Sequence, residues 1–245
     1  MTGRADIVIL DGGPGASGEV TALTDGLVVR GHRVLEPVQT GHSIADIIAG
    51  LRDDIARGCA SPVVLVGWSW GAWLACLYAA TYPDDVRRVV LLGCPPLTER
   101  GAKQLRQTRA ARLSPAQTAE IEALSAAPPD PQITACLMQL FELSDAFDPL
   151  DTPHPAVTID WEQHHAIWAE ASALRRSGGL LDRVASLPMP VRALHGADDP
   201  HPAEDVARSL SALPDFRMTV IDACGHKPWR EAQVDFLDLL AAQLT

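Results

Sequence analysis

The sequence predicts an α/β protein with a doubly wound, mainly parallel sheet of about six strands. Short aliphatic runs alternate with segments whose apolar residues recur at helical spacing. The runs at 7–10 and 63–66 are continuously apolar, as is typical of strands buried on both faces of a parallel sheet. The alternation stops between residues 95 and 188, where only helical patterns occur. We therefore expect a core formed by residues 1–94 and 189–245, and a helical cap insertion over residues 95–188.

Each expected element has a local reason. Strands are expected at 7–10, 32–37, 63–66, 86–92, 191–194 and 216–221, because each run contains aliphatic residues and leads into turn residues. Core helices are expected at 19–30, 44–57, 70–82, 203–213 and 231–244, and Ser43 is placed as an N-cap. The insertion is expected to contain helices at 115–125, 131–147 and 159–176.

Composition limits the classes of partner. The 245 residues carry 20 basic and 31 acidic side chains, a net charge of −11 without blocks of like charge. This balance disfavours nucleic acid and anionic membranes as partners. The five cysteines lack C-x-x-C spacing, which favours free thiols in a reducing compartment. With no signal peptide pattern and no run of membrane-spanning length, we expect a cytoplasmic protein.

Gly67-Trp68-Ser69-Trp70-Gly71 stands between an aliphatic run and an alanine-rich helical segment. A serine on so sharp a strand-to-helix turn is forced into a strained backbone conformation, and its hydroxyl is lifted above the end of the strand. The N-terminus of the following helix favours negative charge at this point. The pattern predicts a nucleophilic serine, with a plain βα turn as the alternative.

A second glycine-rich turn follows the first strand and reads D-G-G-P-G-A-S-G over residues 11–18. It lacks the Lys-Ser/Thr ending of a phosphate-binding loop, and Pro14 removes one N–H from any such cradle. We interpret it as a loop that presents the N–H of Gly13 to an oxyanion. A tight strand-to-helix turn is the alternative.

Two further chemical groups follow strands. Asp198 and Asp199 come after the run at 191–194, and His226 comes after the run at 216–221. Because the carboxyl ends of parallel strands share one edge of the sheet, these groups can meet Ser69. A histidine can take the proton of a serine, and a carboxylate can orient the imidazole. The N–H groups of Trp70 and Gly13 would then stabilise the oxyanion.

The helix expected at 159–176 carries Trp161, His165 and Trp168 on one face. Such a face either packs or lines a pocket, and we expect it to form the substrate pocket together with Trp68. His164 and His165 are poor joint metal ligands, because adjacent helical residues point about 100° apart. No metal or other cofactor is expected.

Four motifs carry a resemblance to a known family: D-G-G-P-G, G-W-S-W-G, H-G-A-D-D and C-G-H-K-P-W. The chain resembles α/β-hydrolases of the proline iminopeptidase-like branch, and the similarity spans nearly the whole core. The resemblance implies an α/β-hydrolase fold in which Asp199 is the catalytic acid, with Asp198 as the alternative and His195 as a structural residue. Asp11 stands where the family usually has histidine, and two N-terminal strands of many relatives are missing.

These observations predict a serine hydrolase that uses Ser69, His226 and Asp199 through an acyl-enzyme, with a small carboxylic ester as first choice of substrate. The family resemblance keeps an N-terminal aminopeptidase open, and a thioesterase, C–C hydrolase or lyase also fits the scaffold. A non-catalytic ligand receptor is the non-enzyme alternative, and the oligomeric state is left open. In an aminopeptidase, cap acids would bind the substrate amine; the candidates are Glu142, Asp145, Asp148, Asp151, Glu162 and Glu170.

Overall fold

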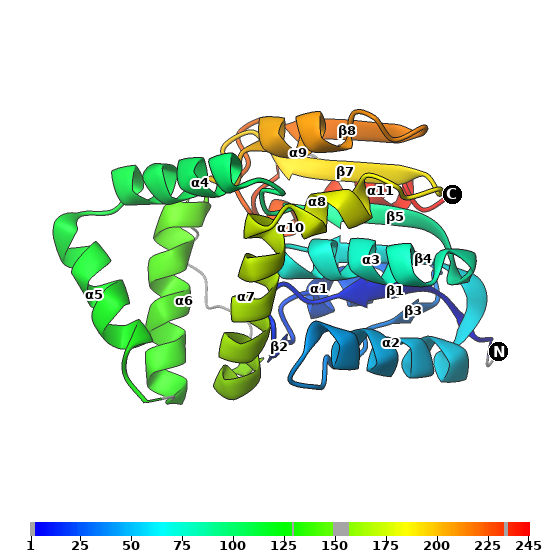
Figure 1. Cartoon of the computed structure of the whole chain (residues 1–245), viewed down its shortest axis with the longest axis horizontal. Helices are drawn as coiled ribbons and strands as arrows, with labels where there is room; N and C mark the ends of the chain where they lie inside the picture. Colours follow the sequence, from blue (N-terminus) through cyan, green and yellow to red (C-terminus); the bar gives the residue numbers. More distant parts are fainter. Residues whose placement is uncertain (1–2, 129, 149–156, 233–234) are drawn as a thin grey trace.

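A parallel sheet of six strands forms the centre of the computed structural model, which describes residues 3–128, 130–148, 157–232 and 235–245. The strand order is β3-β1-β4-β5-β7-β8, which runs from bottom to top of Figure 1. The fold class predicted from the sequence is confirmed. The strands are β1 (Ala5–Leu10), β3 (Val34–Leu35), β4 (Cys59–Trp68), β5 (Val86–Leu92), β7 (Val191–Gly196) and β8 (Phe216–Ile221).

Helices cover both faces of the sheet. On one face α2 (Ile44–Gly58), α3 (Trp70–Thr81) and α9 (Ala203–Leu210) share a hydrophobic cluster with the strands. On the other face α1 (Thr21–Val29) and α11 (Phe236–Ala241) share a second cluster. Helix α3 is buried nearly all round, which explains its apolar composition. Ser43 caps α2 as predicted, since its hydroxyl accepts a hydrogen bond from the Asp46 N–H at 3.1 Å.

The register of the sheet brings the predicted turns to one edge. In the β4–β5 pair Trp68 lies opposite Leu92, and in the β7–β8 pair Gly196 lies opposite Ile221. The segments that follow these strand ends carry Ser69, Asp199 and His226. The parallel arrangement therefore places all three segments beyond the carboxyl ends of the strands.

The segment between β5 and β7, which we call the cap, contains α4 (Glu99–Arg112), α5 (Pro115–Ser125), α6 (Pro131–Asp145), α7 (Trp161–Arg176) and α8 (Gly179–Val184). Helices α4 and α5 each pack on α6, and the three helices extend beyond the strand ends, at the left of Figure 1. Ile167 of α7 and Leu180 of α8 are instead buried in the same cluster as α3. Helices α7 and α8 thus join the other cap helices to the sheet layer.

Several elements differ from the sequence-based expectation. Helix α4 was not predicted, because its buried residues are only Gly101 and Ala102 and it has no apolar stripe to reveal it. Helix α8 was also not predicted. The expected helix start at 159 is occupied by β6 (Thr158–Ile159), which pairs antiparallel with β2 (Ala16–Ser17), and α7 begins after its N-cap Asp160. The helix expected at 231–244 is represented by the shorter α11, and a separate short helix, α10 (Pro228–Glu231), ends where the expected helix would begin; residues 233–234 lie outside the described ranges.

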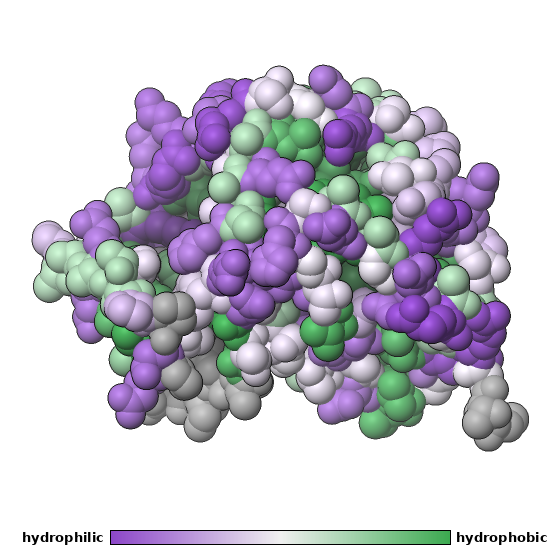
Figure 2. Space-filling model, turned by 60° about the horizontal axis from the view of Figure 1, so that its bottom comes forward, coloured by the Kyte–Doolittle hydropathy of each residue, from purple (hydrophilic) through white to green (hydrophobic). Residues whose placement is uncertain are grey.

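Exposed apolar side chains are scattered. Large exposed apolar side chains include Val29 and Val38 in the N-terminal part of the chain, and Phe147 and Trp168 in the segment between β5 and β7. On the face seen in Figure 2 the hydrophobic residues form small separate patches among hydrophilic ones. Among the described helices, none combines the length and the apolar character needed to cross a bilayer.

Candidate active site

Ser69 sits at a strained turn between β4 and α3. Its backbone has φ 51° and ψ −125°, a conformation that costs a non-glycine residue about 1–3 kcal/mol. The turn needs both flanking glycines: a Cβ at Gly67 would lie 2.1 Å from the carbonyl oxygen of Gly71, and a Cβ at Gly71 would lie 2.4 Å from that of Leu10. The sequence around Ser69 is therefore fitted to hold the serine at the sheet edge.

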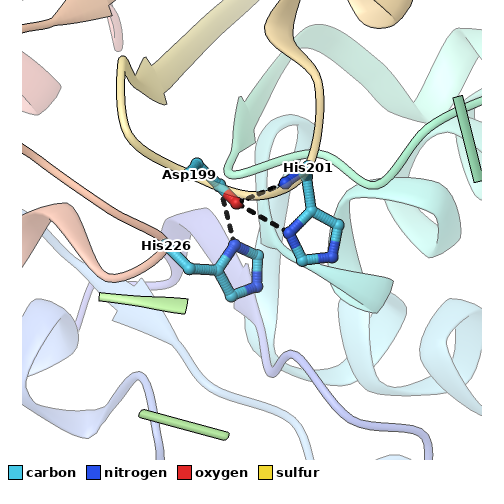
Figure 3. Close-up of side chains that lie close together, drawn as sticks. All are labelled: Asp199, His201 and His226. Atoms are coloured by element: carbon cyan, nitrogen blue, oxygen red, sulfur yellow. Dashed lines mark hydrogen bonds and ion pairs between the residues drawn. The ribbon is translucent and has the colours of Figure 1, made fainter. Parts of the chain in front are cut away.

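His226 and Asp199 are joined by a buried hydrogen bond. The His226 Nδ1–H donates to Asp199 Oδ2 at 2.8 Å (Figure 3). Among the described residues, Asp198 makes hydrogen bonds through its backbone: its N–H donates to the Cys224 carbonyl, and its carbonyl accepts from Arg112. Of the two adjacent carboxylates, Asp199 is thus the one that contacts His226.

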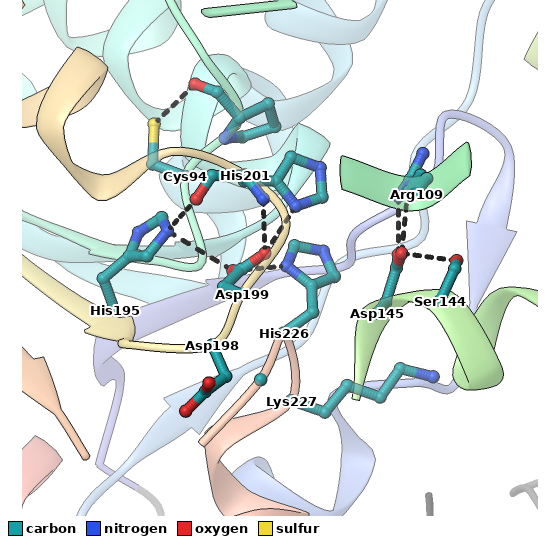
Figure 4. Close-up of polar contacts among 12 residues, drawn as sticks. Cys94, Arg109, Ser144, Asp145, His195, Asp198, Asp199, His201, His226 and Lys227 are labelled. Atoms are coloured by element: carbon teal, nitrogen blue, oxygen red, sulfur yellow. Dashed lines mark hydrogen bonds and ion pairs between the residues drawn. The ribbon is translucent and has the colours of Figure 1, made fainter. Parts of the chain in front are cut away.

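Two more histidines surround Asp199 (Figure 4). His201 donates to Asp199 Oδ1 from its backbone N–H at 2.9 Å and from its ring Nδ1–H at 2.7 Å. The Nε2 of His195 lies 2.8 Å from the His201 carbonyl and 3.4 Å from Asp199 Oδ2. Burial raises the pKa of Asp199, but the three histidines outweigh it and hold that pKa well below its usual range.

Asp199, His201 and His226 have the composition of a transition-metal site, with one potential ligand atom from each lying within 4.8 Å of the others. The contacts between ring nitrogen and carboxylate oxygen, however, are 2.7 and 2.8 Å long. These are hydrogen-bond lengths, too short to admit an ion bonded to both atoms at about 2 Å in tetrahedral geometry. The geometry suits shared protons better than a metal ion.

The two stacked histidines have opposite pKa shifts. Burial lowers the pKa of His226, but the charge and hydrogen bond of Asp199, with the charge of Asp145, raise it above 6.5 overall. Burial and the neighbouring His226 lower the pKa of His201 to about 4. At neutral pH His201 is therefore uncharged, and His226 is the ring that can take up a proton.

The backbone around His226 is held on all sides. The His226 N–H donates to the Asp145 carbonyl of α6 at 2.9 Å, and the indole N–H of Trp68 donates to the His226 carbonyl at 2.9 Å. Glu231 accepts hydrogen bonds from Gly225 N–H at 3.0 Å and Lys227 N–H at 3.2 Å. The histidine turn is thus fixed to the elbow, to α10 and to the cap.

A cavity of about 260 Å³ connects these groups. Ser69 and His226 both line it, and so do Gly13 and Trp70. No described residue accepts a hydrogen bond from the backbone N–H of Gly13 or of Trp70. On the cap side, the wall of the cavity is formed by Arg109, Met138, Phe141, Glu142, Asp145, Ala146, His164 and Trp168.

The four residues predicted to form the pocket divide into two pairs. Trp68 and Trp168 line the cavity. Trp161 and His165 lie outside its lining: the Trp161 indole N–H donates to Thr134 Oγ1 at 3.2 Å, and His165 is exposed. The cavity is instead lined by His164, which stacks on Trp168 four residues further along α7. Trp168 therefore lies on the predicted side of the helix, while one turn earlier the lining residue is His164 and not His165.

The cap acids proposed to bind an amine also lie in different environments. Glu142 and Asp145 line the cavity, and each has a cation beside it: Lys227 Nζ is 3.6 Å from Glu142, and Arg109 holds Asp145 through two contacts of 2.8 and 2.5 Å. Glu170 accepts from the Ile44 N–H at 2.8 Å, outside the cavity. Asp148 and Glu162 are exposed, and Asp151 lies outside the described residues.

Asp11, which stands where the resemblance would place a histidine, has a structural role of its own. Its buried carboxylate accepts backbone hydrogen bonds from Gly18 at 3.0 Å, Glu19 at 3.0 Å and Val20 at 3.1 Å. The Asp11 carbonyl accepts from the side chain of Gln39 at 3.0 Å. Asp11 therefore closes the glycine-rich loop on itself and ties it to α1.

Several residues of the site were not found from the sequence, among them Arg109, His164, Lys227 and Glu231. Arg109 lies on a helix that the apolar pattern does not reveal. The only signal for Lys227 and Glu231 is their closeness in the chain to His226. Closeness in the sequence does not reveal that the Glu231 carboxylate accepts hydrogen bonds from the backbone next to His226.

Comparison with known proteins agrees with this geometry. The family model described as Alpha/beta hydrolase family matches residues 13–239. A 2-(acetamidomethylene)succinate hydrolase from Mesorhizobium japonicum is 41% identical over 83 residues, which are 33% of this chain and 29% of that protein. The chain thus aligns with less than a third of the length of this curated relative.

Solved structures show the same fold at low identity. The esterase EaEST from Exiguobacterium antarcticum superposes with a TM-score of 0.63 at 18% identity, covering 100% of this chain and 93% of that one. The proline iminopeptidase from Mycobacterium smegmatis gives 0.64 at 16% identity, covering 98% and 89%. With the family model matching most of its length, the chain belongs to the alpha/beta hydrolase family.

Proposed function

We propose that this protein is a serine hydrolase in which Ser69, His226 and Asp199 form a catalytic triad. The observation that carries the proposal is the buried Asp199–His226 hydrogen bond of 2.8 Å at a cavity that the strained Ser69 also lines. A serine hydroxyl becomes a good nucleophile only when a base takes its proton. Asp199 fixes the Nδ1–H tautomer of His226, so that Nε2 is left to act as that base.

The reaction follows from these roles. Ser69 Oγ attacks the substrate carbonyl while His226 takes its proton. The tetrahedral oxyanion accepts hydrogen bonds from the Gly13 and Trp70 N–H groups, each worth a few kcal/mol in such a site. His226 then gives the proton to the leaving group, and a water activated by the same histidine releases the acyl group. The residues of the chain are sufficient for these steps without a cofactor.

A small carboxylic ester is the favoured substrate. A cavity of about 260 Å³ is slightly smaller than the usual range of about 300–1,000 Å³ for ligand sites, and much of its wall is made by Trp68, Met138, Phe141 and Trp168. The similarity in fold to an esterase is consistent with this choice.

An N-terminal aminopeptidase is the second candidate. Glu142 and Asp145 line the cavity and could bind an ammonium group. Both already lie beside a cation, Lys227 or Arg109, so a substrate amine would have to compete with a protein side chain. This competition is why the ester is preferred.

The test is a rate comparison of wild type, Ser69→Ala and the control Ser125→Ala, at an exposed position on α5. The substrates are p-nitrophenyl acetate and prolyl p-nitroanilide. Loss of ester turnover by at least about 10³-fold in Ser69→Ala alone supports the proposal. Faster anilide turnover would favour the aminopeptidase. If neither substrate is turned over and a fluorophosphonate probe does not label Ser69, the serine hydrolase proposal is wrong.

A further inference from the structure

His164 is a cavity-lining histidine that the steps above do not use. It lies in the first turn of α7 and is half-buried. Its ring Nδ1 is 3.1 Å from the carbonyl oxygen of Pro14, next to Gly13 in the glycine-rich loop. The ring thus links the cap to the loop that carries one of the two proposed oxyanion donors.

The partner of Nδ1 decides the protonation of the whole ring. A carbonyl oxygen can only accept, so Nδ1 must carry a proton. Burial lowers the pKa of His164 below 6.5, opposed by the bond to Pro14, so the ring is neutral at pH 7. A neutral imidazole protonated at Nδ1 has a bare lone pair at Nε2. His164 therefore offers a hydrogen-bond acceptor at Nε2.

The ring is held in place. The Trp168 ring lies nearly parallel to the His164 ring, with ring centroids 6.4 Å apart and planes inclined by 16°. The Trp161 ring centroid lies 5.3 Å from that of His164. No described residue donates a hydrogen bond to Nε2. The acceptor at Nε2 is therefore left for water or for a molecule bound in the cavity that His164 lines.

Unlike His164, the cationic side chains that line the cavity already have partners within the protein. Arg109 is paired with Asp145 at 2.5 Å, and Lys227 with Glu19 at 3.2 Å. A neutral donor gains little by competing with these ion pairs. The lone pair of His164, in contrast, is satisfied only if water or a ligand supplies an N–H or O–H, and a ligand that displaces the water without a donor leaves the acceptor unpaired.

We infer that His164 is a specificity-determining residue that accepts a hydrogen bond from an uncharged N–H or O–H of the substrate, a few atoms from the scissile carbonyl. The substrate class is thereby narrowed to acylamino or hydroxy acid derivatives. This inference rests on the proposed serine hydrolase function.

Two esters that differ at one atom test it: p-nitrophenyl N-acetylglycinate and p-nitrophenyl 4-oxopentanoate, in which CH₂ replaces N–H. Each rate is divided by the hydroxide-catalysed rate of the same ester. For wild type the N–H ester should have a kcat/KM about 5–10-fold higher, as expected for one neutral hydrogen bond. His164→Asn keeps a donor for Pro14 but lacks the Nε2 position, and it should abolish this preference.

Three further variants sharpen the result. His164→Phe keeps a ring without either nitrogen and should also lose the preference. His164→Gln, whose amide oxygen can reach the Nε2 position, should keep part of it. His42→Phe, at an exposed position outside the cavity lining, should keep all of it. Circular dichroism and thermal unfolding establish that each variant is folded.

Failure of the inference and failure of the proposed function are distinguishable. Equal kcat/KM values in wild type, or a preference that survives in His164→Asn, overturn the inference but leave the hydrolase intact. If wild type hydrolyses neither ester, the function fails, and binding is measured by tryptophan fluorescence with N-acetylglycinamide and 4-oxopentanamide. If wild type binds N-acetylglycinamide more tightly than 4-oxopentanamide and His164→Asn does not, the role of His164 is upheld. Equal binding of the two amides by wild type would overturn it.

Discussion

His201 lies face to face with His226, with ring centroids 4.2 Å apart and planes inclined by 22° (Figure 3). Both imidazoles donate to the carboxylate of Asp199, His201 to Oδ1 and His226 to Oδ2. The donors on Oδ1 prevent the carboxylate from rotating and withdraw negative charge from it. His201 is thus placed to orient Asp199 and to limit how strongly Asp199 holds a proton on His226.

We expect His201→Phe to lower kcat by about 10-fold, since a hydrogen bond to a charged group is worth about 1.5–3 kcal/mol and only part of it is used in positioning. Asp199 loses one donor and keeps more charge for His226, so the pKa of His226 rises. The acid limb of kcat/KM against pH, which reports the free enzyme, should move to higher pH.

His201→Asn is the matched comparison, because its amide can restore a donor to Oδ1 without the stacked ring. It should return the acid limb toward the wild-type position. An acid limb that stays in place in both variants would show that His201 only fills space.

Arg109 and Asp145 should move the acid limb in opposite directions. The charge of Asp145 raises the pKa of His226, and that of Arg109 lowers it. A base acts in its unprotonated form, so a raised pKa places the wild-type limb above 6.5. Asp145→Asn should lower the limb and Arg109→Met should raise it, as measured by kcat/KM from pH 5 to 9.

Ionic strength provides the control for this pair. His226 is buried and adjacent to Asp199, so moderate salt should leave both shifts largely intact. If the acid limb moves in the same direction in Asp145→Asn and Arg109→Met, a displacement of the cap and not the change of charge would be the cause.

The core could be predicted because each chemical group directly follows a strand. Buried parallel strands are recognisable as aliphatic runs, and their carboxyl ends meet at one edge. Ser69, Asp199 and His226 are therefore brought to that edge by topology alone. The family resemblance favours Asp199 over Asp198, and Asp199 is the carboxylate that contacts His226. Its role as the catalytic acid stays a prediction.

The cap could not be predicted to the same degree. Its helices bury few residues, so one residue of rotation decides whether His164 or His165 lines the cavity, and helical spacing does not determine that rotation. The side chains that face the cavity are also paired across distant segments, as Arg109 is with Asp145. No local pattern in the sequence encodes such a pairing.

Asp11 should stabilise the glycine-rich loop. Asp11→Ala leaves three backbone N–H groups without their acceptor, and we expect the free energy of unfolding to fall by about 1–3 kcal/mol. Equilibrium unfolding in urea measures this loss. An unchanged value would mean that water replaces the carboxylate at no cost.

The stability should also depend on pH through Asp11. Burial, only partly offset by the backbone hydrogen bonds, raises its pKa from 3.8 to about 6. The folded state therefore binds the proton more tightly than the unfolded state does. Stability should fall as pH rises from about 4 to about 6 and then level off. The difference in stability between wild type and Asp11→Asn isolates this effect, and a difference independent of pH would contradict it.

Glu231 should position His226 without touching the substrate's reacting atoms. Its Oε2 accepts from Gly225 N–H at 3.0 Å and from Phe147 N–H of the cap at 2.6 Å, and Oε1 accepts from Lys227 N–H at 3.2 Å. In Glu231→Gln one oxygen becomes an NH₂ group facing a backbone donor. We expect kcat to fall about 10-fold with little change in KM, because a buried donor is left unpaired on the histidine turn.

A spectroscopic signature separates this role from general destabilisation. The His226 Nδ1–H, held by Asp199 at 2.8 Å, should give a downfield proton resonance. That resonance should shift or broaden in Glu231→Gln and remain unchanged in Glu122→Gln, a control at an exposed position on α5. If kcat falls while the resonance is unaltered, Glu231 acts on the cap and not on the geometry of His226.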